Sequence, residues 1–178
     1  MNVQIKRLRD EAVIPKYAHD GDSGFDLVAV EDVIVEPGET VKVPTGLAFA
    51  IPNGYELQIR PRSGITSKTK LRVQLGTVDS TYRGEVAVIV DNAVMPSFYY
   101  NEEYRIIGLE YDYKAKYLDG TLAWDEDDWQ HNTYFIRKGD RIAQGVIAPI
   151  VQAKFDEVDT LDETIRGEDG FGSTGVIE

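Results

Sequence analysis

A succession of short alternating apolar segments in the first ninety residues most constrains the fold. Glycine and proline punctuate them, at Pro37-Gly38, Pro44, Gly46 and Pro52-Asn53-Gly54. After an imperfect alternation at Val3, Ile5 and Leu8, the expected strands are Phe25–Val30, Val33–Val35, Thr40–Val43, Leu47–Ile51, Tyr55–Ile59 and Val86–Val90. Strands and turns at this spacing are typical of a β-sandwich or barrel. We therefore predict a single all-β domain over residues 1–178, a jelly roll with one short helical turn near Ser67–Leu71.

Two later segments depart from this pattern. Residues 92–135 are rich in tyrosine, tryptophan and acidic side chains, and they contain the hairpin-turn dipeptide Asp119-Gly120. We interpret them as an insertion with its own hairpin, after which residues 137–151 resume a strand-like pattern. From about residue 160 to 178 the chain is acidic and glycine-rich without a packing pattern, which predicts a flexible C-terminal arm.

Composition excludes several classes of function. The chain has no cysteine and two histidines, so thiol catalysis, disulfides and multi-histidine zinc sites are ruled out. A net charge of −12 disfavours general binding to nucleic acid or anionic membranes. The sequence has no apolar run long enough for a signal peptide or membrane span, so a cytoplasmic location is the expectation.

Five short segments contain the residues suited to chemistry. Ala18–Leu27 delivers Asp26 at the start of a strand, with Phe25 and Leu27 facing the other side. The second segment is RPRSG. Arg62 offers a forked cationic side chain, Ser63 offers a hydroxyl, and Gly64 lets the backbone approach a ligand closely. This combination suits a phosphate. Taken alone, a lone aspartate of this kind is usually a turn or edge residue, and an Arg-Ser-Gly turn is common.

The third and fourth segments add a carboxylate and further polar donors. In GTVDSTYRGE, Asp79 and Tyr82 lie three residues apart in a glycine-bounded turn, where a carboxylate can act as a general base and a tyrosine ring can pack on a sugar. In KGDRIAQ, Arg141 and Gln144 are candidate donors to an anion. A simple hairpin and an ordinary core strand are the competing interpretations.

The fifth segment, RGEDGFGSTG, formally matches the dinucleotide pattern G-x-G-x-x-G. That interpretation fails, because only three residues follow where a Rossmann loop would lead into a helix. What remains is an arm in which Phe171 can cover a base and Arg166 can bind a terminal phosphate.

Together and in this order, the five segments resemble the motifs of the trimeric dUTPases, over nearly the whole chain apart from the insertion. The resemblance implies hydrolysis of dUTP to dUMP and pyrophosphate by a homotrimer with shared active sites, which keeps dUTP out of DNA and supplies dUMP for thymidylate synthesis. It makes Asp79 the general base for water attack on the α-phosphorus. It also implies Mg²⁺ on the phosphates, held by Asp26 through water.

The resemblance further implies the residues that bind the substrate. Tyr82 would pack on the deoxyribose, the backbone around Leu75–Val78 would bind uracil, and Arg141 would pair with a carboxylate. The complete predicted set of substrate-binding residues is Arg62, Ser63, Gly64, Gly76, Thr77, Val78, Tyr82, Gln144, Arg166, Phe171, Gly172, Ser173 and Thr174.

The insertion between the third and fourth motifs makes the chain similar to phage-encoded members, some of which bind a repressor protein. A partner-binding surface would use the aromatic side chains of Tyr104, Tyr111, Tyr113, Trp124 and Trp129, because such residues are enriched at binding hot spots. A hairpin that only decorates the trimer is the equal alternative. Two other functions remain open at this point: a dCTP deaminase-like enzyme, and a regulatory protein with little or no hydrolase activity.

Overall fold

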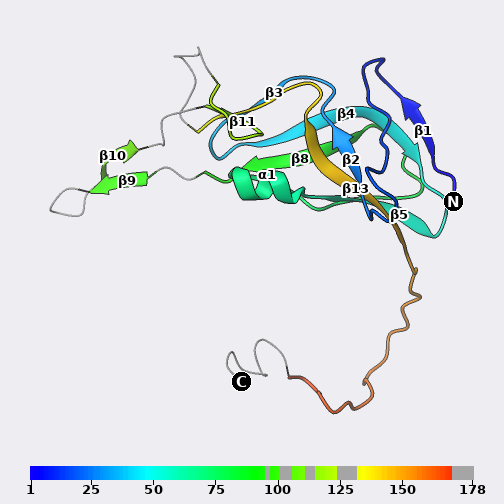
Figure 1. Ribbon diagram of the computed structural model, residues 1–178. Coiled ribbons are helices and arrows are strands. Elements are labelled where there is room, and N and C mark those ends of the chain that lie inside the picture. The colour runs from blue at the N-terminus through cyan, green and yellow to red at the C-terminus, as the bar shows by residue number, and fades with distance from the viewer. Residues whose placement is uncertain (95–96, 101–105, 111–114, 124–131, 170–178) are drawn as a thin grey trace.

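Two four-stranded antiparallel sheets form the body of the molecule in the computed structural model (Figure 1), which describes residues 1–94, 97–100, 106–110, 115–123 and 132–169. The first sheet has the order β1-β4-β8-β6, from β1 (Gln4–Arg7), β4 (Thr40–Ala50), β8 (Val86–Asn92) and β6 (Leu71–Val73). The second has the order β2-β13-β5-β7, from β2 (Phe25–Val28), β13 (Arg141–Pro149), β5 (Tyr55–Arg60) and β7 (Gly76–Val78).

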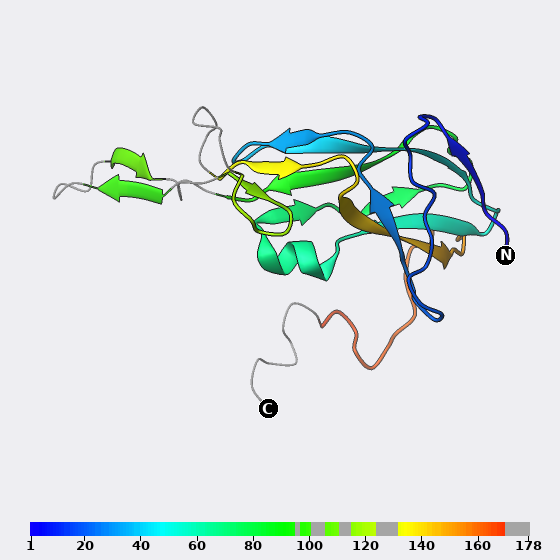
Figure 2. The same cartoon turned by 45° about the horizontal axis from the view of Figure 1, so that its top comes forward.

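One hydrophobic core joins the two sheets. It includes the fully buried side chains of Val43 and Val88 from the first sheet and of Leu27, Leu57 and Ile142 from the second. Figure 2 shows the strands of the two sheets lying over one another, with α1 (Ser63–Lys68) beside them. The predicted all-β jelly roll is therefore confirmed, since α1 is the one helix among the described residues.

Element boundaries differ from the sequence prediction, and two of the differences have a clear physical cause. The segments expected as Thr40–Val43 and Leu47–Ile51 form one continuous strand, β4. The residues that suggested a turn instead form a β-bulge between Pro44 and Leu47, where Gly46 has φ +68°. The helical turn expected at Ser67–Leu71 begins earlier, at Ser63, because the buried side chain of Ile65 anchors the first turn in the core.

Residues 115–123 attach to the body through a third, smaller sheet of order β11-β12-β3. Here β11 (Lys116–Tyr117) pairs in parallel with β12 (Tyr134–Ile136), which pairs with β3 (Val33–Val35). The predicted Asp119-Gly120 turn is confirmed, because the Gly120 amide donates to the Tyr117 carbonyl and a bridge joins Lys116 to Leu122. Leu118 is buried in the core, so this part of the predicted insertion packs against the body.

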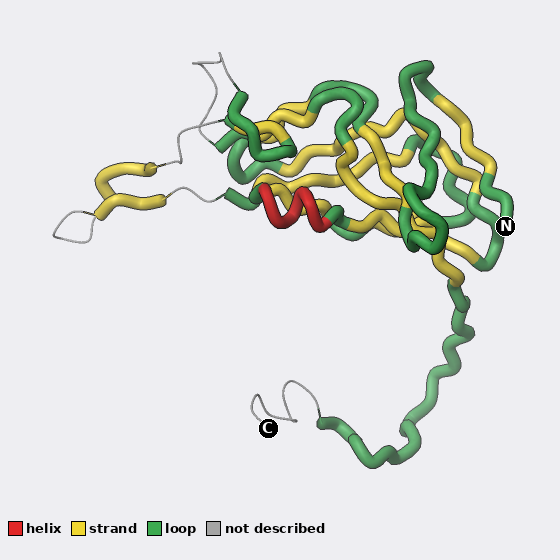
Figure 3. Tube along the Cα trace, in the orientation of Figure 1, coloured by secondary structure: helices red, strands yellow, loops and turns green. Residues whose placement is uncertain are grey.

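Two other segments complete the described chain. The strands β9 (Ser97–Tyr100) and β10 (Ile106–Glu110) pair with each other and with no other described strand. After β13 the chain leaves the body in an extended path without regular structure (Figure 3), and the side chains of residues 151–169 are exposed. None of the helices among the described residues is long and apolar enough to cross a membrane.

Candidate active site

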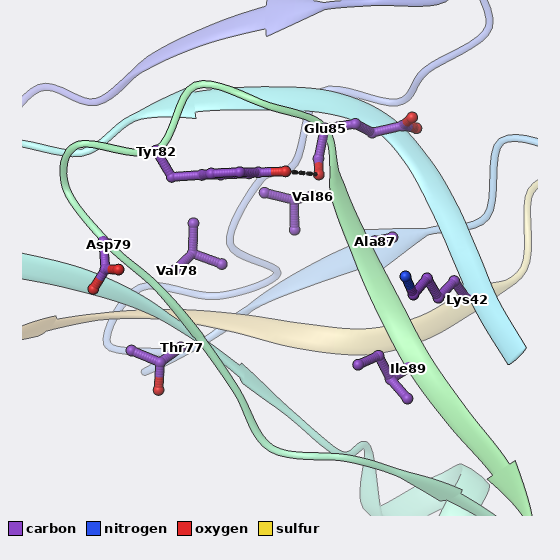
Figure 4. Close-up of a pocket in the computed structure, with 9 residues that line it drawn as sticks. All are labelled: Lys42, Thr77, Val78, Asp79, Tyr82, Glu85, Val86, Ala87 and Ile89. Carbon is purple, nitrogen blue, oxygen red and sulfur yellow. Dashed lines mark hydrogen bonds between the residues drawn. The ribbon is translucent and has the colours of Figure 1, made fainter. Parts of the chain in front are cut away.

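The third sequence motif forms one wall of a recess between β7 and β8 (Figure 4). The recess has a volume of about 340 Å³, within the range of small-molecule sites, and Asp79 and Tyr82 lie in the turn at its end. Its lining residues are Lys42, Thr77, Val78, Asp79, Tyr82, Glu85, Val86, Ala87 and Ile89. Asp79 is exposed, so its carboxylate can reach water and a bound ligand together.

The turn that positions Asp79 and Tyr82 is braced by its own residues. The Tyr82 amide donates to the Asp79 carbonyl at 3.1 Å, and the Tyr82 hydroxyl donates to the Glu85 carbonyl at 3.0 Å. A Cβ at Gly84 would lie 2.3 Å from that hydroxyl, so only glycine lets the ring lie against the turn. The Glu85 carboxylate accepts from the Gly46 amide at 2.7 Å, which ties the turn to the bulge of β4.

The strand β7 is the edge strand of its sheet, and this location suits the recognition of a base. One side of the strand pairs with β5, where Thr77 lies opposite Gln58. No strand of the described residues pairs with the other side, so its peptide groups can bond to a ligand. Gly76 is packed tightly on Ile59, because a Cβ there would come within 3.1 Å of the Ile59 side chain.

A second group of predicted residues gathers around Asp26. Its Oδ1 lies 2.8 Å from Arg62 Nε, without hydrogen-bond geometry, and its Oδ2 accepts from Arg141 Nη1 at 3.2 Å. Arg62 also donates to the Arg141 carbonyl at 3.1 Å, which links α1 to β13. The expected pairing of Arg141 with a carboxylate is confirmed, and Asp26 holds two cationic side chains in place.

Gln144 joins this group through strand register. It lies opposite Asp26 on β2 and opposite Arg60 on β5, and directly paired residues point to the same face of a sheet. Asp26 and Gln144 line a common recess with Ser23 and Gly24. Ser63 and Gly64 begin α1, both are exposed, and a Cβ at Gly64 would meet no atom within 4 Å, which leaves that side of the loop open to a ligand.

Arg166, the predicted arm residue that the structure describes, is not brought to either group within this single chain. Arg166 is exposed on the segment after β13, where its Nε donates to the Asp169 carbonyl at 2.9 Å. The other predicted arm residues and the predicted partner-binding residues lie outside the described part of the chain: Phe171, Gly172, Ser173, Thr174, Tyr104, Tyr111, Tyr113, Trp124 and Trp129.

Most of the described site residues therefore line three recesses, two of which are joined by the ion pair between Arg62 and Asp26. Asp79 and Tyr82 line one recess, Arg62 and Gly64 line a second, and Asp26 and Gln144 line a third. Arg166 lines none of these three recesses and is exposed after β13. Asp79 and Tyr82 thus share no recess with the residues gathered around Asp26.

The donor set suits a cation that arrives with its ligand. Among the described residues no three histidine, aspartate or glutamate side chains gather to hold a metal ion. Mg²⁺ keeps several water molecules and is often held by one or two carboxylates together with substrate phosphates. Asp26, beside Arg62 and Gln144, fits that description as a single outer carboxylate.

Several residues of the first recess were missed by the sequence analysis. Lys42 and Ile89 come from β4 and β8, and no local motif marks them. Glu85 lies within the quoted motif, but its bond to Gly46 depends on a strand forty residues earlier in the chain. Gly46 could have indicated this contact from the sequence, because it marks a bulge where backbone groups do not follow the regular strand pairing.

Fold and geometry together describe a β-sandwich protein with an exposed carboxylate, Asp79, in the turn after β7 and with two arginines gathered around Asp26. The family model described as dUTPase matches residues 10–112 and 129–175. The deoxyuridine 5'-triphosphate nucleotidohydrolase of Nautilia profundicola is 42% identical over 177 residues, covering 98% of this chain and 99% of its own. That of Crocosphaera subtropica is 40% identical over 178 residues, covering 99% and 100%.

Solved structures agree with these relatives. The Staphylococcus bacteriophage 80alpha dUTPase with dUpNHpp superimposes with a TM-score of 0.82 at 31% identity, covering 98% of this chain and 99% of its own. The dUTPase from phage phi11 of S. aureus, whose structure visualises a species-specific insert, gives 0.79 at 29% identity and covers 92% and 100%.

This chain belongs to the dUTPase family. The enzyme class predicted from the sequence, dUTP diphosphatase, is confirmed by relatives of matching length. The two curated relatives are bacterial and the two structures are of phage proteins, so the phage origin stays a prediction. The family model leaves residues 113–128 unmatched, inside the predicted insertion of 92–135.

Proposed function

We propose that the chain hydrolyses dUTP to dUMP and pyrophosphate by attack of water on the α-phosphorus, with Asp79 as the general base. The observation that supports this most is the location of Asp79 and Tyr82 in one recess beside the edge strand β7. A positioned carboxylate that removes a proton in the transition state typically accelerates a reaction by about 10²–10⁴-fold.

The nucleoside end of the substrate occupies this recess. Peptide groups of Gly76, Thr77 and Val78 on the outer side of β7 bind the uracil edge in place of a pairing strand. The Tyr82 ring packs on the deoxyribose, and its fixed location leaves no room for a ribose 2′-hydroxyl. The hydrogen bond of the Tyr82 hydroxyl to the Glu85 carbonyl holds the ring for that purpose.

The phosphates bind to Arg62, Ser63 and Gly64, with Gln144 as a further contact. The guanidinium of Arg62 supplies forked donors, and the Arg141–Asp26–Arg62 contacts keep it oriented. Mg²⁺ fits on the phosphate oxygens with Asp26 beyond its water shell, where it would offset negative charge on the triphosphate. Arg166, Phe171, Gly172, Ser173 and Thr174 close over the bound nucleotide.

A homotrimer completes the site, because Asp79 with Tyr82 and the residues around Asp26 line separate recesses of one chain. The recess of one copy then meets the phosphate-binding residues of a second copy, and an arm covers both. In the cytoplasm, this reaction keeps dUTP out of DNA and supplies dUMP for thymidylate synthesis.

The test is pyrophosphate release with Mg²⁺ from dUTP, dCTP, dTTP and UTP, for the wild type and for Asp79→Asn. We expect hydrolysis of dUTP alone, lost in the variant. Release of ammonia from dCTP would instead support a deaminase, and a folded oligomer that hydrolyses no nucleotide would support a purely regulatory protein.

A second function is binding of a repressor-type protein through the predicted insertion. Similarity to the 80alpha dUTPase, a phage protein whose structures were solved in work on control of virulence-gene transfer, favours it. The aromatic residues Tyr104, Tyr111, Tyr113, Trp124 and Trp129, set among acidic side chains, would form the contact surface.

Point substitutions test this second function better than deletion, because Leu118 within the segment is part of the core. Serine at each of the five aromatic positions should abolish binding of repressor proteins to the immobilised chain while dUTP hydrolysis is retained. Binding that survives all five substitutions would contradict the assignment.

A further inference from the structure

A cationic recess lies beside the predicted phosphate-binding loop and extends beyond it. Its volume is about 380 Å³, within the range of small-molecule sites. It is lined by Arg62, Gly64, Ile65, Lys68, Leu118, Asp119, Arg137, Asp140 and Arg141. Four of these side chains are cationic and two are acidic, in a protein whose net charge is −12. Such a local excess of positive charge favours an anionic ligand.

Residues 115–123 build one wall of this recess. The Lys116 amide donates to the Thr133 carbonyl at 2.9 Å, and the buried side chain of Leu118 anchors the turn in the core. The Tyr117 ring lies against Phe135, its neighbour across the parallel β11–β12 pair, with ring centroids 6.1 Å apart. The segment is thus fixed in place beside α1 and the start of β13.

Tyr117 and two carboxylates hold Arg137 at the rim of the recess. The guanidinium carbon of Arg137 lies 4.3 Å from the centroid of the Tyr117 ring, a cation–π contact. Arg137 Nη2 is 3.7 Å from Asp119, and Nε is 3.7 Å from Asp140. At these distances the two carboxylates orient the guanidinium electrostatically but do not form hydrogen bonds with it.

Both carboxylates are already engaged with other donors. Asp119 accepts from the Thr121 amide at 2.8 Å and from the Thr121 hydroxyl at 2.5 Å, and these bonds hold the pKa of Asp119 below its usual range. Asp140 accepts from the Arg137 backbone amide at 2.9 Å. Neither carboxylate makes the close bidentate pair that arginine forms with a dedicated partner, so the Arg137 fork remains suited to a phosphate.

We propose that Lys68 and Arg137 form a subsite for the terminal phosphates, next to the Arg62–Gly64 loop, and that residues 115–123 position Arg137 in it. The ligand is a pyrophosphoryl group, either the β- and γ-phosphates of the bound nucleotide or the pyrophosphate released from it. This inference rests on the proposed function for its ligand. It gives a part of the predicted insertion a role in substrate binding.

Calorimetric titration with three ligands tests the subsite: inorganic pyrophosphate, the imido analogue dUpNHpp and dUMP. The variants are Arg137→Gln and Lys68→Gln, and Lys138→Gln is the matched control. Lys138 is the next residue along the chain and loses the same charge, but its Nζ lies 3.6 Å from Glu11 and it does not line the recess. Tyr117→Leu and Tyr117→Phe test the positioning segment.

We expect Arg137→Gln and Lys68→Gln each to weaken binding of pyrophosphate and of dUpNHpp by about tenfold or more, because each removes a charge-assisted contact. Binding of dUMP should change less than about twofold, as should every titration with Lys138→Gln. Tyr117→Leu should weaken pyrophosphate binding by about two- to fivefold, and Tyr117→Phe should retain it, since phenylalanine preserves the ring beneath the guanidinium.

Two results would overturn the subsite: unchanged pyrophosphate and dUpNHpp binding in both charge variants, or equal losses for dUMP and dUpNHpp. A loss for dUpNHpp alone would assign the subsite to the bound nucleotide, and a loss for pyrophosphate alone would assign it to the product. Failure of the wild type to hydrolyse dUTP, with pyrophosphate binding still lost in the charge variants, would reject the proposed function and keep the anion subsite. Lys68 is exposed on α1, so its variant stays informative even if Arg137→Gln reduces the thermal stability.

Discussion

The recess around Asp79 and Tyr82 and the residues proposed to bind the phosphates are built in opposite ways. The recess is mostly local, because β7, the turn at Asp79–Tyr82 and β8 follow one another in the chain and brace themselves through Gly84 and Glu85. The residues proposed to bind the phosphates come from the start of α1 and from β13, and they are joined by long-range contacts: the ion pairs of Asp26 on β2 and the hydrogen bond from Arg62 to the Arg141 carbonyl. A local unit can be disrupted by a change in one neighbouring residue, whereas a dispersed unit depends on the whole fold.

The largest expected effect is at Asp79 itself. Asp79→Asn preserves the size of the side chain but removes the base, so kcat should fall by about 10²–10⁴-fold while pyrophosphate binding is unchanged. Steady-state kinetics with dUTP and a pyrophosphate titration measure the two quantities. A variant that retains more than about a tenth of kcat would show that another group accepts the proton.

Removal of divalent cations should affect the binding of the triphosphate rather than the recess around Asp79. Without Mg²⁺, kcat/KM should fall by at least about a hundredfold, because the triphosphate charge is no longer offset. The melting temperature without nucleotide should not change, since the described residues offer no resident metal cluster. Chelation that lowers this melting temperature would instead indicate a structural ion in the protein.

Gly84→Ala tests the bracing of the recess. Its Cβ would lie 2.3 Å from the Tyr82 hydroxyl and 2.5 Å from the ring carbon that bears it, so the ring must move. We expect kcat/KM for dUTP to fall by about tenfold or more, with weaker discrimination against UTP and unchanged pyrophosphate binding. An unaltered preference for dUTP over UTP would show that the Tyr82 ring does not select the sugar.

The smallest expected effect is at Glu85, which ties the turn to β4. Glu85→Ala leaves the partly buried Gly46 amide without its acceptor, which should lower the free energy of unfolding by about 1 kcal/mol and kcat/KM by a few fold. Glu85→Gln retains an acceptor oxygen and should remain close to the wild type. Thermal unfolding and steady-state kinetics compare the two variants. Equal results for Glu85→Ala and Glu85→Gln would show that the bond from Gly46 to Glu85 does not stabilise the turn.

The same contrast between local and long-range contacts explains which features could be predicted from the sequence. Alternating apolar residues and turn signals predicted most strands and the jelly roll, since a period of two is legible along the chain. The pairing of Arg141 with a carboxylate was predicted through the family resemblance and is confirmed at Asp26. The bulge at Gly46, the Glu85 anchor and the docking of Tyr117 on Arg137 were not predictable, because each joins residues that only the folded chain brings together.

The most direct test of this account is complementation between two inactive variants. Asp79→Asn lacks the base of the recess, and Arg62→Gln lacks a cation of the phosphate-binding loop. Each variant alone should be nearly inactive. Co-expressed in equal amounts, they should recover about a quarter of wild-type activity if each site takes Asp79 and Arg62 from different copies. No recovery from proven mixed oligomers would mean that both residues act within one copy, and it would contradict the shared site.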